Sequence, residues 1–176
     1  MSETENAEVV LPTSPEALLA RLEDLDIAAK TVTHPPVYTV EEAKALRGEL
    51  PGSHIKNLFL RNKKGQMWLV TCLEDRQVDL KALGQRLEAG RFSFGSADRL
   101  MTYLGVQPGS VTPFSVINDT ENQVTMVLDT GVMSAGPVNC HPLVNTMTTA
   151  VSPDDLIRFL EAEGHAPQML DMGAEA

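Results

Sequence analysis

The order of apolar and polar residues along the chain predicts short strands with single helices between them. Five segments are predicted to be helices, most of them with a capping residue or a proline in the first turn. They begin at Ser14, Thr39, Asp79, Ser96 and Ser152. Segments with strand-like composition lie between turn signals. These are residues 31–33, 54–61, 66–70, 92–94, 114–117, 124–128, 138–140 and 146–151.

Two pairs of the predicted strands are close enough in sequence to form hairpins. Residues 54–61 and 66–70 flank a turn that ends at Gly65, and residues 114–117 and 124–128 flank a polar turn. Strands joined by short turns and mixed with single helices indicate an α+β domain. We therefore expect one domain with a mixed, largely antiparallel sheet flanked by helices, and flexible tails at residues 1–13 and 171–176.

Composition supports one packed domain and limits where the protein works. The chain has 176 residues, 43% hydrophobic and 22% charged, which suffices for a single core. The acidic N-terminus has no signal-peptide pattern, and no apolar stretch is long enough to cross a membrane. Cys72 and Cys140 could form one disulfide, but a core of this size does not need one. Because the chain also has eight methionines and no export signal, we expect reduced thiols and a cytoplasmic protein.

Several common catalytic signatures are absent from the sequence. It contains no phosphate-binding P-loop, no dinucleotide-binding glycine fingerprint and no serine-hydrolase elbow. The four histidines, at positions 34, 54, 141 and 165, lack metal-ligand spacing. We therefore expect neither a metal site nor a cofactor, and spacing alone leaves the mechanism open.

Four segments, taken together, are informative. They are residues 34–43 (HPPVYTVEEA), 54–60 (HIKNLFL), 109–114 (GSVTPF) and 139–146 (NCHPLVNT). In this order they closely resemble the YbaK-like aminoacyl-tRNA editing family, which is related to the editing insertion domain of bacterial prolyl-tRNA synthetase. Among its branches, the chain looks most like the freestanding alanyl-tRNA(Pro) deacylases. The resemblance extends over residues 14–170.

The resemblance implies catalytic roles for Lys56 and for the loop that begins at Gly109. Alternation along the strand places Lys56 on the face of Leu58 and Leu60, so its ammonium must reach a cavity or an edge. There it would hold the 3′-terminal phosphate or polarise the ester. Gly109 opens a GxxxP loop whose backbone amides would stabilise the developing oxyanion. An ordinary solvated lysine and an ordinary turn are the alternatives.

The remaining candidate residues are expected to bind the substrate. Ser110 and Pro113 belong to the GxxxP loop, and the resemblance places Asn139 and His141 at the wall of the amino-acid pocket. Asn57 is expected either to contact the substrate or to pair with the backbone, and His34 and Tyr38 to shape the pocket rim. His141 also has a structural interpretation, as a hydrogen-bonded histidine at a strand end.

The implied activity is hydrolysis of mischarged Ala-tRNA(Pro) in trans to alanine and free tRNA. The implied partners are the tRNA(Pro) 3′ end and, transiently, prolyl-tRNA synthetase or an elongation factor, with neither membrane nor DNA. Alternatives are another amino acid on the same scaffold, such as cysteine in Cys-tRNA(Pro), a non-catalytic module that binds tRNA or protein, and a metal hydrolase.

The net charge of −10 first argues against a polyanionic partner, but its distribution changes that conclusion. Residues 1–26 carry −6 and residues 152–176 carry −5, which leaves +1 for the segment between them. Residues 56–91 contain eight basic and four acidic side chains. The sequence thus fits a weak, brief tRNA contact, although such charged runs are often only solvated faces.

Overall fold

Eight strands form the centre of the protein. The computed structural model describes residues 10–36, 52–134 and 136–173. Its strands are β1 (Lys30–Thr33), β2 (Ser53–Arg61), β3 (Met67–Leu73), β4 (Ser93–Phe94), β5 (Val124–Asp129), β6 (Val138–Cys140), β7 (Met147–Val151) and β8 (Gln168–Leu170).

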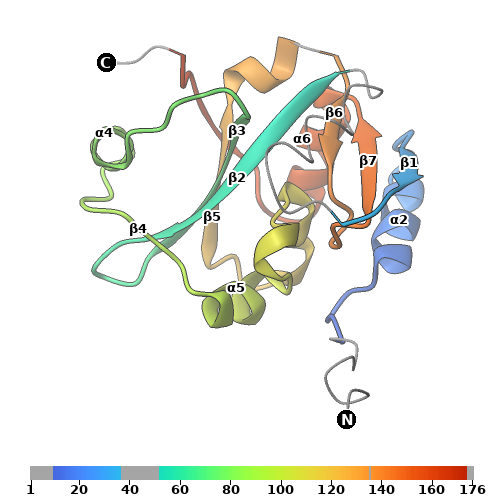
Figure 1. Ribbon diagram of the computed structural model, residues 1–176, viewed down its shortest axis with the longest axis horizontal. Helices are drawn as coiled ribbons and strands as arrows, with labels where there is room; N and C mark the ends of the chain where they lie inside the picture. Colours follow the sequence, from blue (N-terminus) through green and yellow to red (C-terminus); the bar gives the residue numbers. More distant parts are fainter. Residues whose placement is uncertain (1–9, 37–51, 135, 174–176) are drawn as a thin grey trace.

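The strands join into one mixed sheet in the order β1-β7-β6-β2-β3-β5-β8, and β4 pairs with β2 at the side (Figure 1). Four of these pairings are antiparallel: β1–β7, β6–β7, β2–β3 and β2–β4. Three are parallel: β2–β6, β3–β5 and β5–β8. The expected α+β fold with a mixed sheet is therefore confirmed, and β2 connects its two halves.

Helices begin where the sequence offers a cap. The described α-helices are α2 (Pro15–Asp24), α4 (Leu80–Arg86), α5 (Ala97–Leu104) and α6 (Pro153–Ala162). The hydroxyls of Ser14, Ser96 and Ser152 each accept a hydrogen bond from an amide in the first turn, as N-caps do. The capping box predicted at Thr39 lies outside the described residues.

The two faces of the sheet carry two hydrophobic cores. The larger core packs Phe59 and Leu69 against α2, α5 and α6, with Phe114 and Phe159 in edge-to-face contact. The smaller core packs Leu60 and neighbouring strand residues under α4. Because Phe59 and Leu60 are adjacent in β2 and enter different cores, the strand is buried on both sides.

The second predicted hairpin is wrong in its first arm. Residues 108–110, 113–118 and 130–134 form the 3₁₀ helices η1 (Pro108–Ser110), η2 (Pro113–Asn118) and η3 (Thr130–Ser134). The predicted strand 114–117 is therefore helical: Thr112 caps it, and residues 113–116 are all buried, so no alternation exists. The carboxylate of Asp119 then accepts the amides of Gln123 and Val124, and β5 pairs in parallel with β3 instead.

The C-terminal end holds a strand that the sequence pattern did not predict. β8 pairs with β5, and Met172 packs against the smaller core. Along the described chain, no helix combines the length and the apolar character that crossing a membrane requires.

Candidate active site

The start of β2 is fixed to the start of β6 by a close backbone contact. The amide of Ser53 donates to the carbonyl of Pro137 at 2.7 Å. Gly52 has a φ of +102°, and a Cβ there would lie 2.1 Å from the same carbonyl oxygen. Only glycine meets both requirements, so this position sets the register of the two parallel strands.

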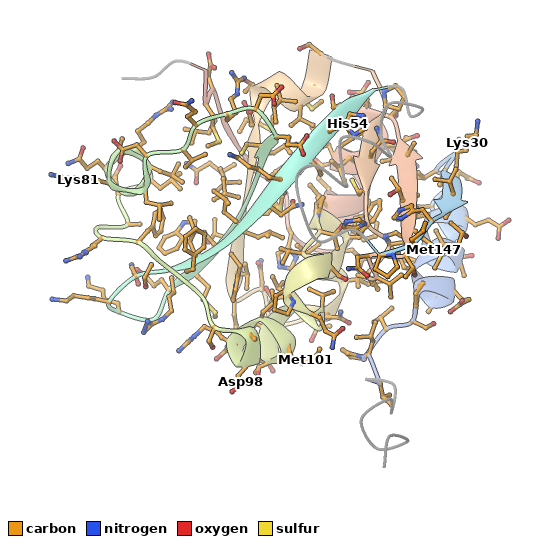
Figure 2. All side chains as sticks on the ribbon, viewed as in Figure 1. Lys30, His54, Lys81, Asp98, Met101 and Met147 are labelled. Carbon is orange, nitrogen blue, oxygen red and sulfur yellow. The ribbon has the colours of Figure 1, made fainter. Side chains whose placement is uncertain are left out.

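That register gathers polar residues from four strands on one face of the sheet. Asn139 in β6 lies opposite His54 in β2 and also opposite Ala150 in β7, which in turn lies opposite Lys30 in β1. Residues paired across a ladder point to the same face. Lys30 and Met147 mark this end of the molecule in Figure 2, and Lys81 marks the other.

The same pair helps to place Lys56 and His141. Lys56 lies two residues beyond His54 within β2, and a step of two residues along a strand keeps its side chain on the face of His54. His141 lies two residues beyond Asn139 and directly follows the end of β6. Thr148 in β7 precedes Thr149, which pairs with Cys140 of β6.

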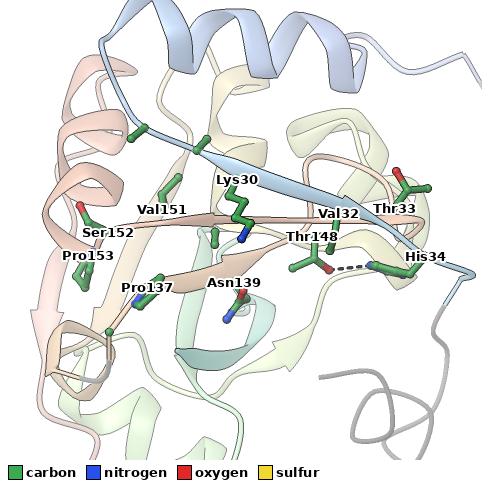
Figure 3. Close-up of a pocket in the computed structure, with 14 residues that line it drawn as sticks. Lys30, Val32, Thr33, His34, Pro137, Asn139, Thr148, Val151, Ser152 and Pro153 are labelled. Carbon is green, nitrogen blue, oxygen red and sulfur yellow. Dashed lines mark hydrogen bonds between the residues drawn. The ribbon is translucent and has the colours of Figure 1, made fainter. Parts of the chain in front are cut away.

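A cleft of about 860 Å³ lies on this face (Figure 3). Its polar lining includes Lys30, His34, Asn139 and Thr148, and Pro137 and Pro153 close one end. This volume lies within the usual range of small-molecule sites, about 300–1,000 Å³. It is large enough for a nucleoside with an attached amino acid.

His141 presents one ring nitrogen as an acceptor. Its Nδ1 lies 3.0 Å from the carbonyl of Met147, and because a carbonyl only accepts, Nδ1 carries the proton. Burial lowers the pKa of His141 below its ordinary value, the bond to Met147 opposes this, and nearby His34 adds to the lowering. The ring is therefore neutral at pH 7, and its Nε2 accepts hydrogen bonds.

His34 lies beside His141 but has both ring nitrogens in use. The two ring centroids are 6.4 Å apart. Nδ1 of His34 bonds to the carbonyl of Pro35 at 2.8 Å, and Nε2 bonds to the hydroxyl of Thr148 at 2.7 Å (Figure 3). His34 therefore shapes the cleft wall, and Tyr38, expected beside it, lies outside the described residues.

Lys56 is held by a neutral group. Its Nζ donates to the carbonyl of Arg76, which lies beyond the end of β3 and lines a second hollow of about 340 Å³ with His54. Across the strands Lys56 faces Cys72, whose pKa is raised to about 11, chiefly by burial, so the thiol stays neutral. Among the described residues no carboxylate forms an ion pair with this ammonium.

Asn57 points to the opposite face of β2. Its amide nitrogen donates to the carbonyl of Val111 at 3.1 Å, and its amide oxygen accepts from the buried hydroxyl of Thr71 at 2.5 Å. Val111 is the centre of the Gly109–Pro113 loop. Asn57 therefore ties this loop to the sheet on the side away from Lys56.

The Gly109–Pro113 loop is built from two short helices. Gly109 is exposed, whereas Ser110 and Pro113 are buried. The amide of Ser110 donates to the carbonyl of Gln107 at 2.8 Å, and that of Ser115 donates to the carbonyl of Thr112 at 3.1 Å. These amides serve the loop itself, so oxyanion donors would have to come from its other residues.

The predicted residues thus form two groups. His34 and Asn139 line the cleft and His141 lies beside His34, whereas Lys56 lies on the face of His54 and bonds to Arg76, which lines the second hollow. Asn57 belongs with the Gly109–Pro113 loop on the other face of β2. Sequence reasoning missed Lys30 and Thr148, although alternation around Val32 and the strand at 146–151 carried the signal. In the part of the chain that the structure describes, no three His, Cys, Asp or Glu side chains gather as metal ligands.

Comparison with known proteins identifies the family of this chain. A family model described as "Aminoacyl-tRNA editing domain" matches residues 34–159, a range that includes all of the predicted site residues but not Lys30. The chain belongs to the aminoacyl-tRNA editing domain family. The expected family is therefore confirmed, and so is its enzyme class: this editing domain is an aminoacyl-tRNA deacylase.

Relatives of this editing domain cover almost its whole length. It is 36% identical over 158 residues to the "Prolyl-tRNA editing protein ProX" of Acetoanaerobium sticklandii, covering 89% of this chain and 96% of that protein. It is 40% identical over 156 residues to "Prolyl-tRNA synthetase associated domain-containing protein 1" of Mus musculus, covering 86% and 92%.

Solved structures share the fold of the editing domain. A crystal structure described as "a putative trans-editing enzyme for prolyl tRNA synthetase" has a TM-score of 0.70 at 20% identity, over 93% of this chain and 98% of that one. Hypothetical protein APE2540 has a TM-score of 0.69 at 19% identity, over 88% and 97%. At these identities the match shows the fold alone.

Proposed function

We propose that this protein hydrolyses mischarged Ala-tRNA(Pro) in trans, releasing alanine and free tRNA(Pro). The observation that carries the proposal is the position of Lys56 and His141, each two residues beyond the paired His54 and Asn139, together with a cleft of nucleoside size that Asn139 lines. The names of the relatives, a prolyl-tRNA editing protein and domains associated with prolyl-tRNA synthetase, support tRNA(Pro) as the carrier.

Lys56 supplies the positive charge of the site. An ammonium has three N–H donors, and the bond to Arg76 uses one. The others are available to the 3′-terminal phosphate or to the ester carbonyl oxygen, where negative charge develops. The backbone at Gly109 is the second proposed contributor to oxyanion stabilisation.

His141 orients the attacking water or the substrate. Its Nε2 accepts a hydrogen bond from that water or from a substrate group, and Asn139 and His34 line the cleft nearby. The water oxygen attacks the ester carbonyl carbon, and the bond from that carbon to the ribose oxygen breaks. The ribose oxygen takes up a proton, which leaves alanine and an intact tRNA. An aminoacyl ester is already activated, so placement and electrostatics suffice.

Pocket size explains why such an enzyme is useful. The aminoacylation site of a synthetase that is built for proline discriminates weakly against the smaller alanine, because each methylene provides only roughly 10–200-fold selectivity. A second pocket that admits alanine and excludes proline adds the missing discrimination. Cysteine is also small, so Cys-tRNA(Pro) is the alternative substrate on the same scaffold.

Deacylation assays with Ala-, Cys-, Ser- and Pro-tRNA(Pro) test the proposal. We expect release of alanine at the highest kcat/KM, no acceleration with Pro-tRNA(Pro), and the same rates with and without a chelator. Faster release of cysteine would support the alternative substrate. Binding of tRNA without turnover of any of the four would leave a non-catalytic module, and loss of activity on chelation would support a metal hydrolase.

A basic surface at the far end of β2 is the proposed contact for the tRNA stem. Lys63, Lys64 and Arg91 are exposed and line a hollow of about 300 Å³ together with Glu88. Arg91 also lines a neighbouring hollow with Lys81. Figure 2 labels Lys81 at the end of the molecule away from Lys30. Nine strand residues at about 3.3 Å each place this end about 26 Å from the start of β2. A stem whose 3′ end enters the cleft could therefore reach it.

A further inference from the structure

The residue that accepts the ammonium of Lys56 also forms an ion pair with a buried carboxylate. The carboxylate of Asp129, at the end of β5, is fully buried and accepts Nε of Arg76 at 2.9 Å and Nη2 at 3.4 Å. Arg76 is the residue whose carbonyl accepts the ammonium of Lys56. Arg76 therefore links Asp129 to Lys56, through its guanidinium on one side and its backbone carbonyl on the other.

The carboxylate also fixes the backbone around Arg76. Asp129 accepts the amide of Leu73 at 3.2 Å and that of Gly131 at 2.9 Å. The amide of Arg76 donates to the carbonyl of Leu73 at 3.1 Å, which closes the turn after β3. The turn that carries the Arg76 carbonyl is thus held at both ends.

Two glycines leave room for the guanidinium. A Cβ at Gly131 would lie 2.4 Å from Nη2 of Arg76, and a Cβ at Gly173 would lie 2.7 Å from Nη1. Any larger side chain at either position would displace the guanidinium or be displaced by it. The glycines therefore let the guanidinium lie against the Asp129 carboxylate, while the turn closed by the amide of Arg76 and the carbonyl of Leu73 orients the Arg76 carbonyl.

Electrostatics keep the pair ionised. Burial alone would raise the pKa of Asp129, but the bonds from Arg76 and from the amides of Gly131 and Leu73 outweigh it and hold the pKa below its ordinary value. The same side-chain hydrogen bond raises the pKa of Arg76. The two charges satisfy each other, so the group facing Lys56 is a neutral carbonyl.

We infer that Asp129 and Arg76 are positioning residues for Lys56. A lysine side chain has many rotamers, and a fixed carbonyl acceptor selects one of them. A carboxylate at the same place would also hold the ammonium but would neutralise it. The carbonyl holds the ammonium and leaves its charge available for a substrate anion. The inference rests on the proposed catalytic role of Lys56.

The first test uses Asp129→Asn in the full-length chain, with Arg76→Gln as a second variant. Both loosen the turn and keep most of the side-chain volume. We expect kcat for Ala-tRNA(Pro) to fall by about tenfold or more, because small misplacements of a reacting group cost up to about 10²-fold, while KM changes less than about twofold.

The matched control is Asp119→Asn. Asp119 is also a buried carboxylate that accepts two backbone amides, and it pairs with His165 at 2.8 Å, away from Lys56. We expect a comparable fall in melting temperature with kcat unchanged. An equal loss of kcat in Asp119→Asn would make Asp129 a purely structural residue and overturn the inference. Failure of both Asp129→Asn and Arg76→Gln to fold would do the same.

A second readout does not depend on activity. The chain has six lysines, so the NMR signal of the Lys56 Cε methylene can be assigned by its loss in Lys56→Ala. We expect that signal to shift and become averaged in Asp129→Asn and to stay unchanged in Asp119→Asn. An unchanged signal in both would overturn the positioning role, whereas a wild-type protein that releases no amino acid would overturn the proposed function instead.

Discussion

The two faces of β2 use polar side chains for different purposes. On one face, Lys56 donates to the carbonyl of Arg76 and forms no ion pair with a carboxylate of the described residues. On the other face, the side-chain amide of Asn57 donates to the carbonyl of Val111 and accepts from the hydroxyl of Thr71. Adjacent residues in the same motif thus differ in role, because alternation in a strand sends them into different surroundings.

The largest effect is expected when the positive charge of Lys56 is removed. Lys56→Ala should lower kcat/KM for Ala-tRNA(Pro) by about 10²–10³-fold, the usual cost of a lost oxyanion-stabilising donor. The melting temperature should change little, because the side chain is only half-buried. Release of labelled alanine under single-turnover conditions measures the effect.

Lys63→Ala is the matched control for that variant, since it removes the same charge at the exposed turn. It should retain nearly all of kcat. Full activity in Lys56→Ala would end the assignment of Lys56 as a catalytic residue.

His141 provides the next largest effect and a pH signature. His141→Ala should reduce kcat by about 10²-fold, at the lower end of what proton-transfer groups contribute. In the wild type, the ring has to be neutral to accept at Nε2. Because its pKa lies below the ordinary 6.5, kcat should be level above pH 6.5 and fall only as the pH drops below that value.

The neighbouring His34 sharpens that test. His34→Ala should leave the shape of the pH profile unchanged, since both nitrogens of His34 bond within the protein. A fall in kcat that begins well above pH 6.5, or an unchanged profile in His141→Ala, would contradict the role given to His141.

Local features were predictable from sequence, and contacts between distant residues were not. Ser14, Ser96 and Ser152 cap helices as expected, because a cap depends only on residues three positions away. The hairpin around Gly65 was equally local. By contrast, the segment 114–117 has strand-like composition but lies in a 3₁₀ helix. Residues 114–116 are all buried, so the segment shows no alternation of buried and exposed side chains.

The candidate site shows the same division. Lys56 and His141 lie in recognisable motifs, so sequence identified them. The pairing of Arg76 with Asp129 spans 53 positions, and nothing in either local pattern indicates the other residue. The separation of Asn57 from Lys56 was visible in the alternation, but the partner that holds Asn57 was not.

The opposite face of β2 should respond in stability rather than in rate. Asn57→Ala removes the acceptor of the buried Thr71 hydroxyl, so unfolding should become easier by about 1–3 kcal/mol. The double variant Asn57→Ala with Thr71→Val should recover part of this loss, because no buried hydroxyl is then left unpaired. Chemical denaturation measures the stability, and kcat is compared at equal folded fraction. A large loss of kcat with unchanged stability would place Asn57 in the site.

The smallest effect is expected at the basic end of β2, far from both faces of the site. The double variant Lys63→Ala with Lys64→Ala should raise KM for Ala-tRNA(Pro) a few-fold at low salt and leave kcat unchanged, because phosphate contacts add affinity and not chemistry. The salt dependence of KM should also weaken.

The control is the double variant Arg21→Gln with Arg158→Gln. It also removes two positive charges, but from α2 and α6, and it should leave KM unchanged. If both double variants raise KM equally, net charge governs the encounter and no stem contact exists at this end. If only the lysine variant does, the tRNA lies along β2, with its 3′ end on the face of Lys56.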